Sequence, residues 1–425
     1  MTQNTISHSD HELPRFTWQS GALKNARKKR MRLAWSVWFV AALFVLFQFF
    51  LQLSSGEVIN GLMKSFALTA FGGGILASSY YYIYVLLQTP AGMLMDRYGP
   101  RGILSAGALV VCLGSFIFSS ASSVAMALLG RVLMGGGSAF AFVGCLNIIS
   151  IWFPKRQFAF MAAVVETAGV IGAIIGNFWL AHFIEKTGWR NCMMIAGIIA
   201  AILSVFLYSI VRNSPRKKSS RVNVDHFSLR ENFKPILCNS LVWVNGTYSG
   251  LMFGIVTVFI ALWAIPFFET SRHIDLVNAT LIACALYGGI AIGGPIIGWV
   301  DGRTHWRRCI MIFNAFCASL LLFIIIFDTQ LSLSITALLL FLTGVCASSY
   351  VLTFAIANDL SSPENRATCI GFTNMLCVVF APILQPFIGF LITHLSMPNH
   401  FEWAVSVVPV SLIVAGVIGF FLPQK

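Results

Sequence analysis

The stretch Pro90–Arg101 reads PAGMLMDRYGPR, and it decides the fold. A long apolar run ends at Met95, and Asp96, Arg97 and Arg101 follow it among glycines and a proline. An apolar run of about 20 residues can cross a bilayer, and charged residues collect where such a helix leaves it. We therefore interpret the stretch as a loop between two membrane helices.

The composition of the whole chain indicates a membrane protein. Of its 425 residues, 57% are hydrophobic and only 10% are charged, and the mean hydropathy is +0.81. A soluble protein needs far more charge to cover its surface. Apolar runs of spanning length recur along nearly the whole chain, which predicts an all-α polytopic membrane protein.

The net charge of +13 and the ten cysteines do not point to other functions. The basic residues lie in short segments between apolar runs, as membrane topology requires, so we expect no nucleic-acid partner. The cysteines show no CxxC pair and no metal-ligand spacing. Most lie within apolar runs, where cysteine behaves as a small hydrophobic residue. We expect no disulfide, no metal and no cofactor.

The hydropathy pattern predicts twelve transmembrane helices, which a basic segment divides six and six. The predicted spans are residues 33–53, 66–95, 102–121, 123–150, 159–183, 190–211, 238–267, 277–300, 307–327, 331–357, 366–394 and 402–422. Lysine and arginine concentrate in the segments that a cytoplasmic N-terminus would place inside, so both termini are expected to be cytoplasmic. The predicted organisation is a cytoplasmic tail (1–32), a six-helix bundle (33–211), a basic linker (212–236), a second six-helix bundle (237–422) and a short tail (423–425).

The two groups of helices repeat each other. PAGMLMDRYGPR follows the second span, and PIIGWVDGRTHWRR, beginning at Pro295, follows the eighth. In each, a proline lies six residues before an aspartate and arginines follow. WFPKRQFAF before the fifth span and SSPENRATC before the eleventh also correspond. Motifs that recur six helices apart predict two parallel repeats, an arrangement found in transporters.

These motifs resemble those of the major facilitator superfamily, over essentially the whole length. The family's loop signature, Gly-x-x-x-Asp-Arg-x-Gly-Arg-Lys/Arg, is matched by Gly92, Asp96, Arg97, Gly99 and Arg101, with Pro100 at the first basic position. Its helix 4 signature, Arg-x-x-Gln-Gly-x-Gly-x-Ala, is matched by Arg131, Gly135, Gly137 and Ala139, with Met134 in place of the glutamine. The resemblance implies two pseudo-symmetric six-helix bundles that rock about a site near the membrane midplane. It implies a secondary active transporter and not an enzyme.

Two ionisable residues, Glu166 and Arg131, lie well inside the predicted spans. An ionisable group in a membrane interior is costly and is a functional candidate for that reason. We predict that Glu166 is a protonation site that couples transport to the proton gradient. Arg131 is predicted to bind an anionic substrate through its planar fork or, as the resemblance implies, to take part in proton coupling. Each residue also has a structural alternative. Glu166 could be permanently paired with a polar neighbour, and Arg131 could serve helix packing.

Further polar residues fall in helices that, by the resemblance, line the central cavity, or in the neighbouring second and eleventh helices. The predicted substrate-binding set, with Arg131, is Gln48, Gln52, Tyr80, Tyr84, Asn147, Asn245, Tyr248, Ser349, Tyr350, Thr353, Asn374 and Gln385. For any single member, interhelical hydrogen bonding is an equally good explanation.

Conformational control is assigned to the two repeated loops. The predicted gating residues are Gly92, Asp96, Arg97, Gly99, Arg101, Asp301 and Arg303. Asp96 is predicted to accept hydrogen bonds from arginines or from the N-terminus of a facing helix in the other bundle. Such an intracellular latch would stabilise the outward-open state.

Small residues and prolines predict where helices pack closely or break. Gly172–Gly176, Gly289–Gly293 and Gly294–Gly298 are GxxxG pairs, which place the fifth and eighth spans at close contacts between the bundles. Pro382 and Pro386 predict an interruption in the eleventh span.

The function predicted from the sequence is proton-coupled symport, for uptake of a small polar or anionic organic solute. Two alternatives stay open: a proton-coupled exporter of a drug or a carboxylate siderophore, and a transporter-like ligand sensor. The helix 5 region lacks the proline of the family's exporter signature, which disfavours antiport. We expect a monomer in the bilayer of a bacterial inner membrane.

Overall fold

The computed structural model describes residues 16–53, 66, 70–213, 229–304, 306–396 and 399–424, in which the regular structure is helical throughout. Residues 1–15 of the predicted N-terminal tail and residues 214–228 of the predicted linker lie outside the described residues.

The helices fall into two groups along the chain. The N-terminal group is α1 (Phe16–Leu53), α3 (Ala70–Tyr98), α4 (Pro100–Ser119), α5 (Val124–Trp152), the 3₁₀-helix η1 (Lys155–Gln157), α6 (Phe158–Thr187) and α7 (Trp189–Ile210). The C-terminal group is α8 (Leu229–Leu237), α9 (Ser240–Gly254), the π-helix η3 (Ile255–Trp263), α10 (Ala264–Arg272), α11 (Leu276–Arg303), α12 (Arg307–Phe327), α13 (Leu333–Ala347), the 3₁₀-helix η4 (Ser348–Val351), α14 (Leu352–Leu360), α15 (Arg366–Val379), α16 (Ala381–His394), α17 (His400–Val405) and α18 (Val407–Gly419).

Within the described residues, 11 helical stretches are long and apolar enough to cross a membrane. They do not include α3, a 29-residue helix at the position of the second expected span. Each of the twelve expected ranges contains helix. The chain is therefore an all-α polytopic membrane protein, whereas the number of crossings and the orientation of the termini stay predictions.

The predicted loop at residues 96–101 is much shorter than the sequence suggests. Helix α3 continues to Tyr98 and α4 begins at Pro100, so Gly99 alone separates the two helices. Gly99 has φ +80°, a conformation that favours glycine, and proline is well suited to the first position of a helix. Asp96 consequently lies in the last turn of α3.

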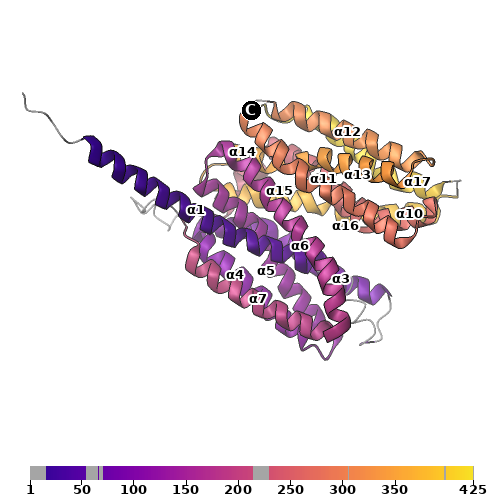
Figure 1. The fold of residues 1–425 in the computed structure, drawn as a ribbon, viewed down its shortest axis with the longest axis horizontal. Helices are drawn as coiled ribbons and strands as arrows, with labels where there is room; N and C mark the ends of the chain where they lie inside the picture. Colours follow the sequence, from indigo (N-terminus) through magenta and orange to yellow (C-terminus); the bar gives the residue numbers. More distant parts are fainter. Residues whose placement is uncertain are drawn as a thin grey trace, which may run out of the picture.

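Figure 1 shows α1, α4, α5 and α7 gathered on one side of the molecule and α12, α13 and α17 on the other. Within the groups, α4 packs against α5 and α7, and α11 packs against α13. Two extensive contacts join the groups, one between α3 and α15 and the other between α6 and α11. We call these the α3–α15 seam and the α6–α11 seam.

Both seams depend on close backbone approach. A Cβ atom on Gly92 of α3 would lie 2.2 Å from the Ala367 carbonyl oxygen of α15. A Cβ atom on Gly298 of α11 would lie 2.7 Å from the Ala159 carbonyl oxygen of α6. The Gly294–Gly298 pair thus faces the other group, as predicted.

The other two GxxxG pairs differ from this prediction. Gly289 packs on α13, and Gly172 packs on the Leu46 carbonyl of α1, so both contacts are internal to a group. A GxxxG spacing predicts close approach but not the identity of the neighbouring helix. The predicted break in the eleventh span is confirmed: α15 ends at Val379, and α16 begins at Ala381, just before Pro382.

Candidate functional site

The predicted cationic residue Arg131 lies buried in α5. Its guanidinium carbon lies 5.0 Å from the centroid of the Tyr80 ring, a cation–π contact with α3. The Tyr80 hydroxyl lies close to Gln48 of α1 and Ser138 of α5, although it makes no hydrogen bond of standard geometry within the described residues. Three N-terminal helices therefore bring their polar side chains together around one guanidinium group.

Gln48 and Gln52 share one face of α1, as their spacing predicts. The Gln48 amide Nε2 donates to Gln52 Oε1 over 2.6 Å, and Gln48 is fully buried. The Gln48 Oε1 atom is buried without a hydrogen-bond partner within the described residues. A buried acceptor without a partner is costly, and binding sites are among the places where that cost is tolerated.

Two tyrosines of α3 lead from Arg131 toward the centre of the molecule. The rings of Tyr80 and Tyr84 are stacked, with centroids 6.1 Å apart. Tyr84 lies next to Gln88 of its own helix and Asn374 of α15. The Asn374 amide Nδ2 donates to Gln88 Oε1 over 2.9 Å, and this buried hydrogen bond joins the two groups of helices.

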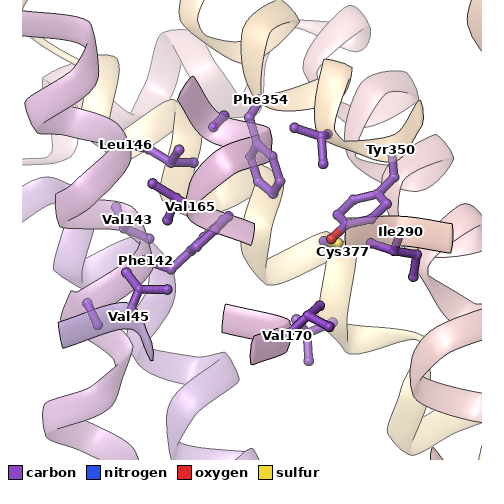
Figure 2. Close-up of a cluster of buried hydrophobic side chains, with 14 of the residues drawn as sticks. Val45, Phe142, Val143, Leu146, Val165, Val170, Ile290, Tyr350, Phe354 and Cys377 are labelled. Carbon is purple, nitrogen blue, oxygen red and sulfur yellow. The ribbon is translucent and has the colours of Figure 1, made fainter. Parts of the chain in front are cut away.

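The predicted acidic residue Glu166 is buried in α6 and faces the C-terminal group. Its carboxyl group lies next to the Tyr350 hydroxyl of η4 and within electrostatic range of Tyr84 and Cys377. Figure 2 shows the Tyr350 side chain pointing toward Cys377. The structure thus connects the only two ionisable residues predicted within the spans through a run of aromatic and polar side chains.

We call this run the central polar path and define it as Arg131, Tyr80, Tyr84, Glu166 and Tyr350. All five residues are buried. Four belong to the N-terminal group, and Tyr350 belongs to the C-terminal group. The path therefore brings a buried guanidinium group and a buried carboxyl group into one run of neighbouring side chains.

An apolar layer lies beside Tyr350. The rings of Phe142 from α5 and Phe354 from α14 meet edge to face, with centroids 5.2 Å apart (Figure 2). Phe354 also contacts the Tyr350 ring, with centroids 6.5 Å apart, and Val165 is part of the same cluster. The layer therefore packs against the central polar path at Tyr350.

Other predicted substrate-binding residues bond within the C-terminal group. Asn245 Nδ2 donates to the Thr353 carbonyl over 2.9 Å, and the Tyr248 hydroxyl donates to the Met311 carbonyl over 2.8 Å. Ser349 lies 3.5 Å from that hydroxyl, and Gln385 Nε2 donates to the Thr257 carbonyl over 2.7 Å. These hydrogen bonds explain Tyr248, Ser349 and Gln385 as helix-packing groups, whereas the Asn245 Oδ1 atom is buried without a hydrogen-bond partner within the described residues.

Thr353 and Asn147, two further members of the predicted substrate-binding set, differ in their hydrogen bonding. The Thr353 hydroxyl donates to Ser249 Oγ over 3.0 Å, which joins α14 to α9. Asn147 is buried in α5, and its Oδ1 atom has no hydrogen-bond partner within the described residues. Asn147 is therefore the better of the two candidates for contact with a ligand.

The predicted latch residue Asp96 caps the facing helix α15. Its Oδ1 accepts from the Ala367 amide over 2.9 Å, and its Oδ2 accepts from the Thr368 amide over 2.7 Å and the Thr368 hydroxyl over 2.6 Å. A carboxylate at a helix N-terminus satisfies unpaired amides and complements the helix dipole. The contact fixes the α3–α15 seam where Gly92 allows close approach.

The three predicted gating arginines make contacts within their own groups. Arg101 Nε donates to the Tyr208 carbonyl of α7 over 2.8 Å, while Arg97 lies over the Tyr98 ring and Arg303 over the Trp299 ring. None of these three contacts crosses a seam.

Asp301, the repeat counterpart of Asp96, has different partners. It accepts from Arg307 Nε and Nη2, each over 2.8 Å. Arg307 also pairs with Asp359 over 2.9 Å, and Asp359 lies 3.9 Å from Lys155 Nζ of the N-terminal group. The second copy therefore uses a chain of ion pairs where the first uses a helix cap.

Ser138 and the Phe142–Phe354 pair were absent from the predicted set. Ser138 lies seven residues after Arg131, so helical spacing places both on one face of α5 and could have identified it. The phenylalanine pair carries no such signal, because an apolar residue in an apolar helix is normally a packing residue.

A two-group helical membrane fold with a buried polar path between the groups defines a transporter of the alternating-access class. The chain belongs to the Major Facilitator Superfamily, whose sequence model matches residues 37–386. The chain is 25% identical over 365 residues to a probable L-galactonate transporter of Escherichia coli, with 80% of each chain covered. It is 22% identical over 287 residues to the uncharacterized transporter YybO of Bacillus subtilis, covering 62% of this chain and 65% of that protein. The solved structure of the E. coli fucose:proton symporter FucP matches with a TM-score of 0.70 at 15% identity, over 91% of this chain and 100% of that one.

Proposed function

We propose that this transporter moves a small anionic organic solute of the sugar-acid class into the cell by symport with protons. The observation that carries the proposal is the central polar path, which joins a buried arginine to a buried carboxyl group across the two groups of helices. A sugar acid offers a carboxylate for a guanidinium fork and hydroxyls for tyrosines and amides. The likeness to the probable L-galactonate transporter supports the same class.

The path suggests how a proton and a solute could share one cycle. Arg131 and the stacked tyrosines would hold the carboxylate and hydroxyl groups of the solute. Glu166 would exchange a proton, and its contact with Tyr350 would make that exchange sensitive to the separation of the two groups of helices. In this conformation Asp96 holds the α3–α15 seam closed, which would be a step in the transport cycle in which the two groups of helices are joined at the Asp96 end.

The experiment is uptake into proteoliposomes with an imposed inward proton gradient, using radiolabelled L-galactonate as the probe and L-fucose as the neutral comparison. Wild-type protein should accumulate the sugar acid above its external concentration. Glu166→Gln should abolish this accumulation and retain counterflow exchange between internal and external solute. The glutamine resembles the protonated carboxyl group, so the variant can carry solute in both directions but cannot release a proton and return empty.

The matched control is Glu269→Gln, which removes an exposed carboxylate of α10 and should leave accumulation unchanged. Gradient-driven accumulation by Glu166→Gln at the wild-type level would disprove the proton-coupling proposal. Accumulation of L-fucose in preference to the sugar acid would disprove the substrate class and leave proton coupling to be judged separately.

A further inference from the structure

A hollow lies at the charged end of the α6–α11 seam, and none of the residues of the central polar path lines it. It is a cavity of about 550 Å³ between α1, η1, α6 and α11. Its lining includes Trp35, Arg156, Phe160, Trp299 and Arg303, and no acidic residue is among the described residues that line it. Its size falls within the usual range for small-molecule sites.

The cavity presents two exposed guanidinium groups from opposite sides of the seam. Arg156 comes from the N-terminal group and Arg303 from the C-terminal group. Within the described part of the chain, neither forms a salt bridge. Arg303 lies over the Trp299 ring, 3.8 Å from its centroid, so this aromatic contact holds the guanidinium in place. Two arginines that line one cavity favour a phosphate or phosphodiester anion.

An exposed apolar strip leads from the cavity along α11. Ile292, Ile296 and Trp299 precede Arg303 at helical spacing, and all three are about half exposed. Trp35 and Phe39 form a similar exposed pair on α1. In a membrane protein such surfaces contact acyl chains, and tryptophan marks the depth of the lipid headgroups. The arginines therefore lie at headgroup level above a path suited to an acyl chain.

We propose that this cavity is a binding site for an anionic membrane phospholipid, with the phosphodiester between Arg156 and Arg303 and an acyl chain along Ile292, Ile296 and Trp299. Basic pockets between membrane helices suit such headgroups. Beside this cavity, a Cβ atom on Gly302 of α11 would lie 2.5 Å from the Arg156 carbonyl oxygen of η1, so the two groups of helices are in contact there. The bound lipid bridges the α6–α11 seam and stabilises its closed state.

The test compares lipids retained by the purified full-length protein in native mass spectrometry. From equal mixtures, wild-type protein should retain phosphatidylglycerol in about tenfold excess over phosphatidylcholine, as expected for one or two charge-assisted contacts. Arg156→Gln/Arg303→Gln should lose this preference. The control Arg30→Gln/Arg308→Gln removes the same charge from arginines outside the cavity and should retain it.

A second measurement needs only wild-type protein. Brominated phosphatidylglycerol should quench tryptophan fluorescence more than brominated phosphatidylcholine, and unbrominated phosphatidylglycerol should reverse the difference while inorganic phosphate should not. Equal retention of the two lipids, or a preference that survives the double substitution, would overturn the proposal. Displacement by millimolar inorganic phosphate would also overturn it, since the site would then bind a soluble anion.

Discussion

At the scale of single residues, Asp96 and Asp301 show that one repeated position makes two different kinds of contact. Asp96 accepts three hydrogen bonds from the first turn of α15, in the other group of helices. Asp301 is paired with Arg307 within its own group. We therefore propose that the direct latch belongs to Asp96, and that Asp301 anchors the ion pairs that end at Lys155.

Asp96→Asn should open the α3–α15 seam. One carboxylate oxygen is replaced by an NH₂ group, which cannot accept a hydrogen bond from the backbone N–H groups of α15. A hydrogen bond to a charged group contributes about 1.5–3 kcal/mol, so losing one should raise the open population roughly tenfold or more. The reporter is Cys369, which is 1% exposed in α15 beside the latch. Its alkylation rate, measured by peptide mass spectrometry, should rise by that factor.

The control for this experiment is Asp275→Asn, which alters another aspartate cap, on Asn278 in the first turn of α11, and leaves α3 and α15 untouched. It should not change the alkylation of Cys369. Buried Cys145, in the core of α5, reports general unfolding and should stay protected in both variants. Equal Cys369 alkylation in wild type and Asp96→Asn would refute the latch.

The sequence led to Asp96 and to a helix N-terminus as its partner, because a repeated charged motif and the dipole rule are both local signals. It also led to Arg131 and Glu166, because embedded charges are rare. The sequence could not distinguish Tyr80 and Tyr84, which belong to the central polar path, from Tyr248, which does not. All three are tyrosines within apolar helices, and only the neighbouring helices determine that Tyr248 bonds to the Met311 carbonyl.

At the scale of helices, the α6–α11 seam closes on glycine. Gly298→Ala should disfavour the closed seam, because the new methyl group would meet backbone atoms of Ala159 and Phe160 at 2.7 Å. Overpacking of this kind costs about 1–3 kcal/mol. Uptake in proteoliposomes should slow. Alkylation of Cys369 should rise, although Cys369 lies at the α3–α15 seam and Gly298 at the α6–α11 seam, because the two groups of helices move apart together.

Gly102→Ala is the matched control, because a Cβ there meets no atom within 4 Å. It introduces the same methyl group on α4 and should leave both measurements unchanged. If the two alanine variants behave alike, close packing at Gly298 does not control the conformational change.

Helix positions were largely predictable, because a bilayer demands long apolar runs. The ends of the helices were less predictable. The DRYGPR sequence suggested a loop of several residues, but helical geometry continues through Tyr98 and one glycine makes the turn. The π-helix Ile255–Trp263 had no visible sequence signal, since its residues are as apolar as those of its neighbours.

At the scale of the whole molecule, the orientation in the membrane rests on the distribution of lysine and arginine. Exposed Cys238, between α8 and α9, tests it directly. If the linker is cytoplasmic, a membrane-impermeant maleimide should modify Cys238 in inside-out vesicles and not in right-side-out vesicles. A permeant maleimide should modify it in both, and this serves as the control. Modification in right-side-out vesicles alone would invert the topology.

The two polar contacts that join the groups of helices, Lys155–Asp359 and Asp96 with α15, differ in chemistry, and this has a physiological consequence. Both side chains of the Lys155–Asp359 pair are exposed, Lys155 at 68% and Asp359 at 39%, so dissolved salt screens their attraction. The Asp96 contact is made to backbone amides in a partly buried position, where screening is much weaker. When a cell loses water and its internal salt concentration rises, the Lys155–Asp359 contact weakens and the Asp96 contact does not. Osmotic stress would then change how readily the carrier opens inward, without any regulatory domain or bound effector.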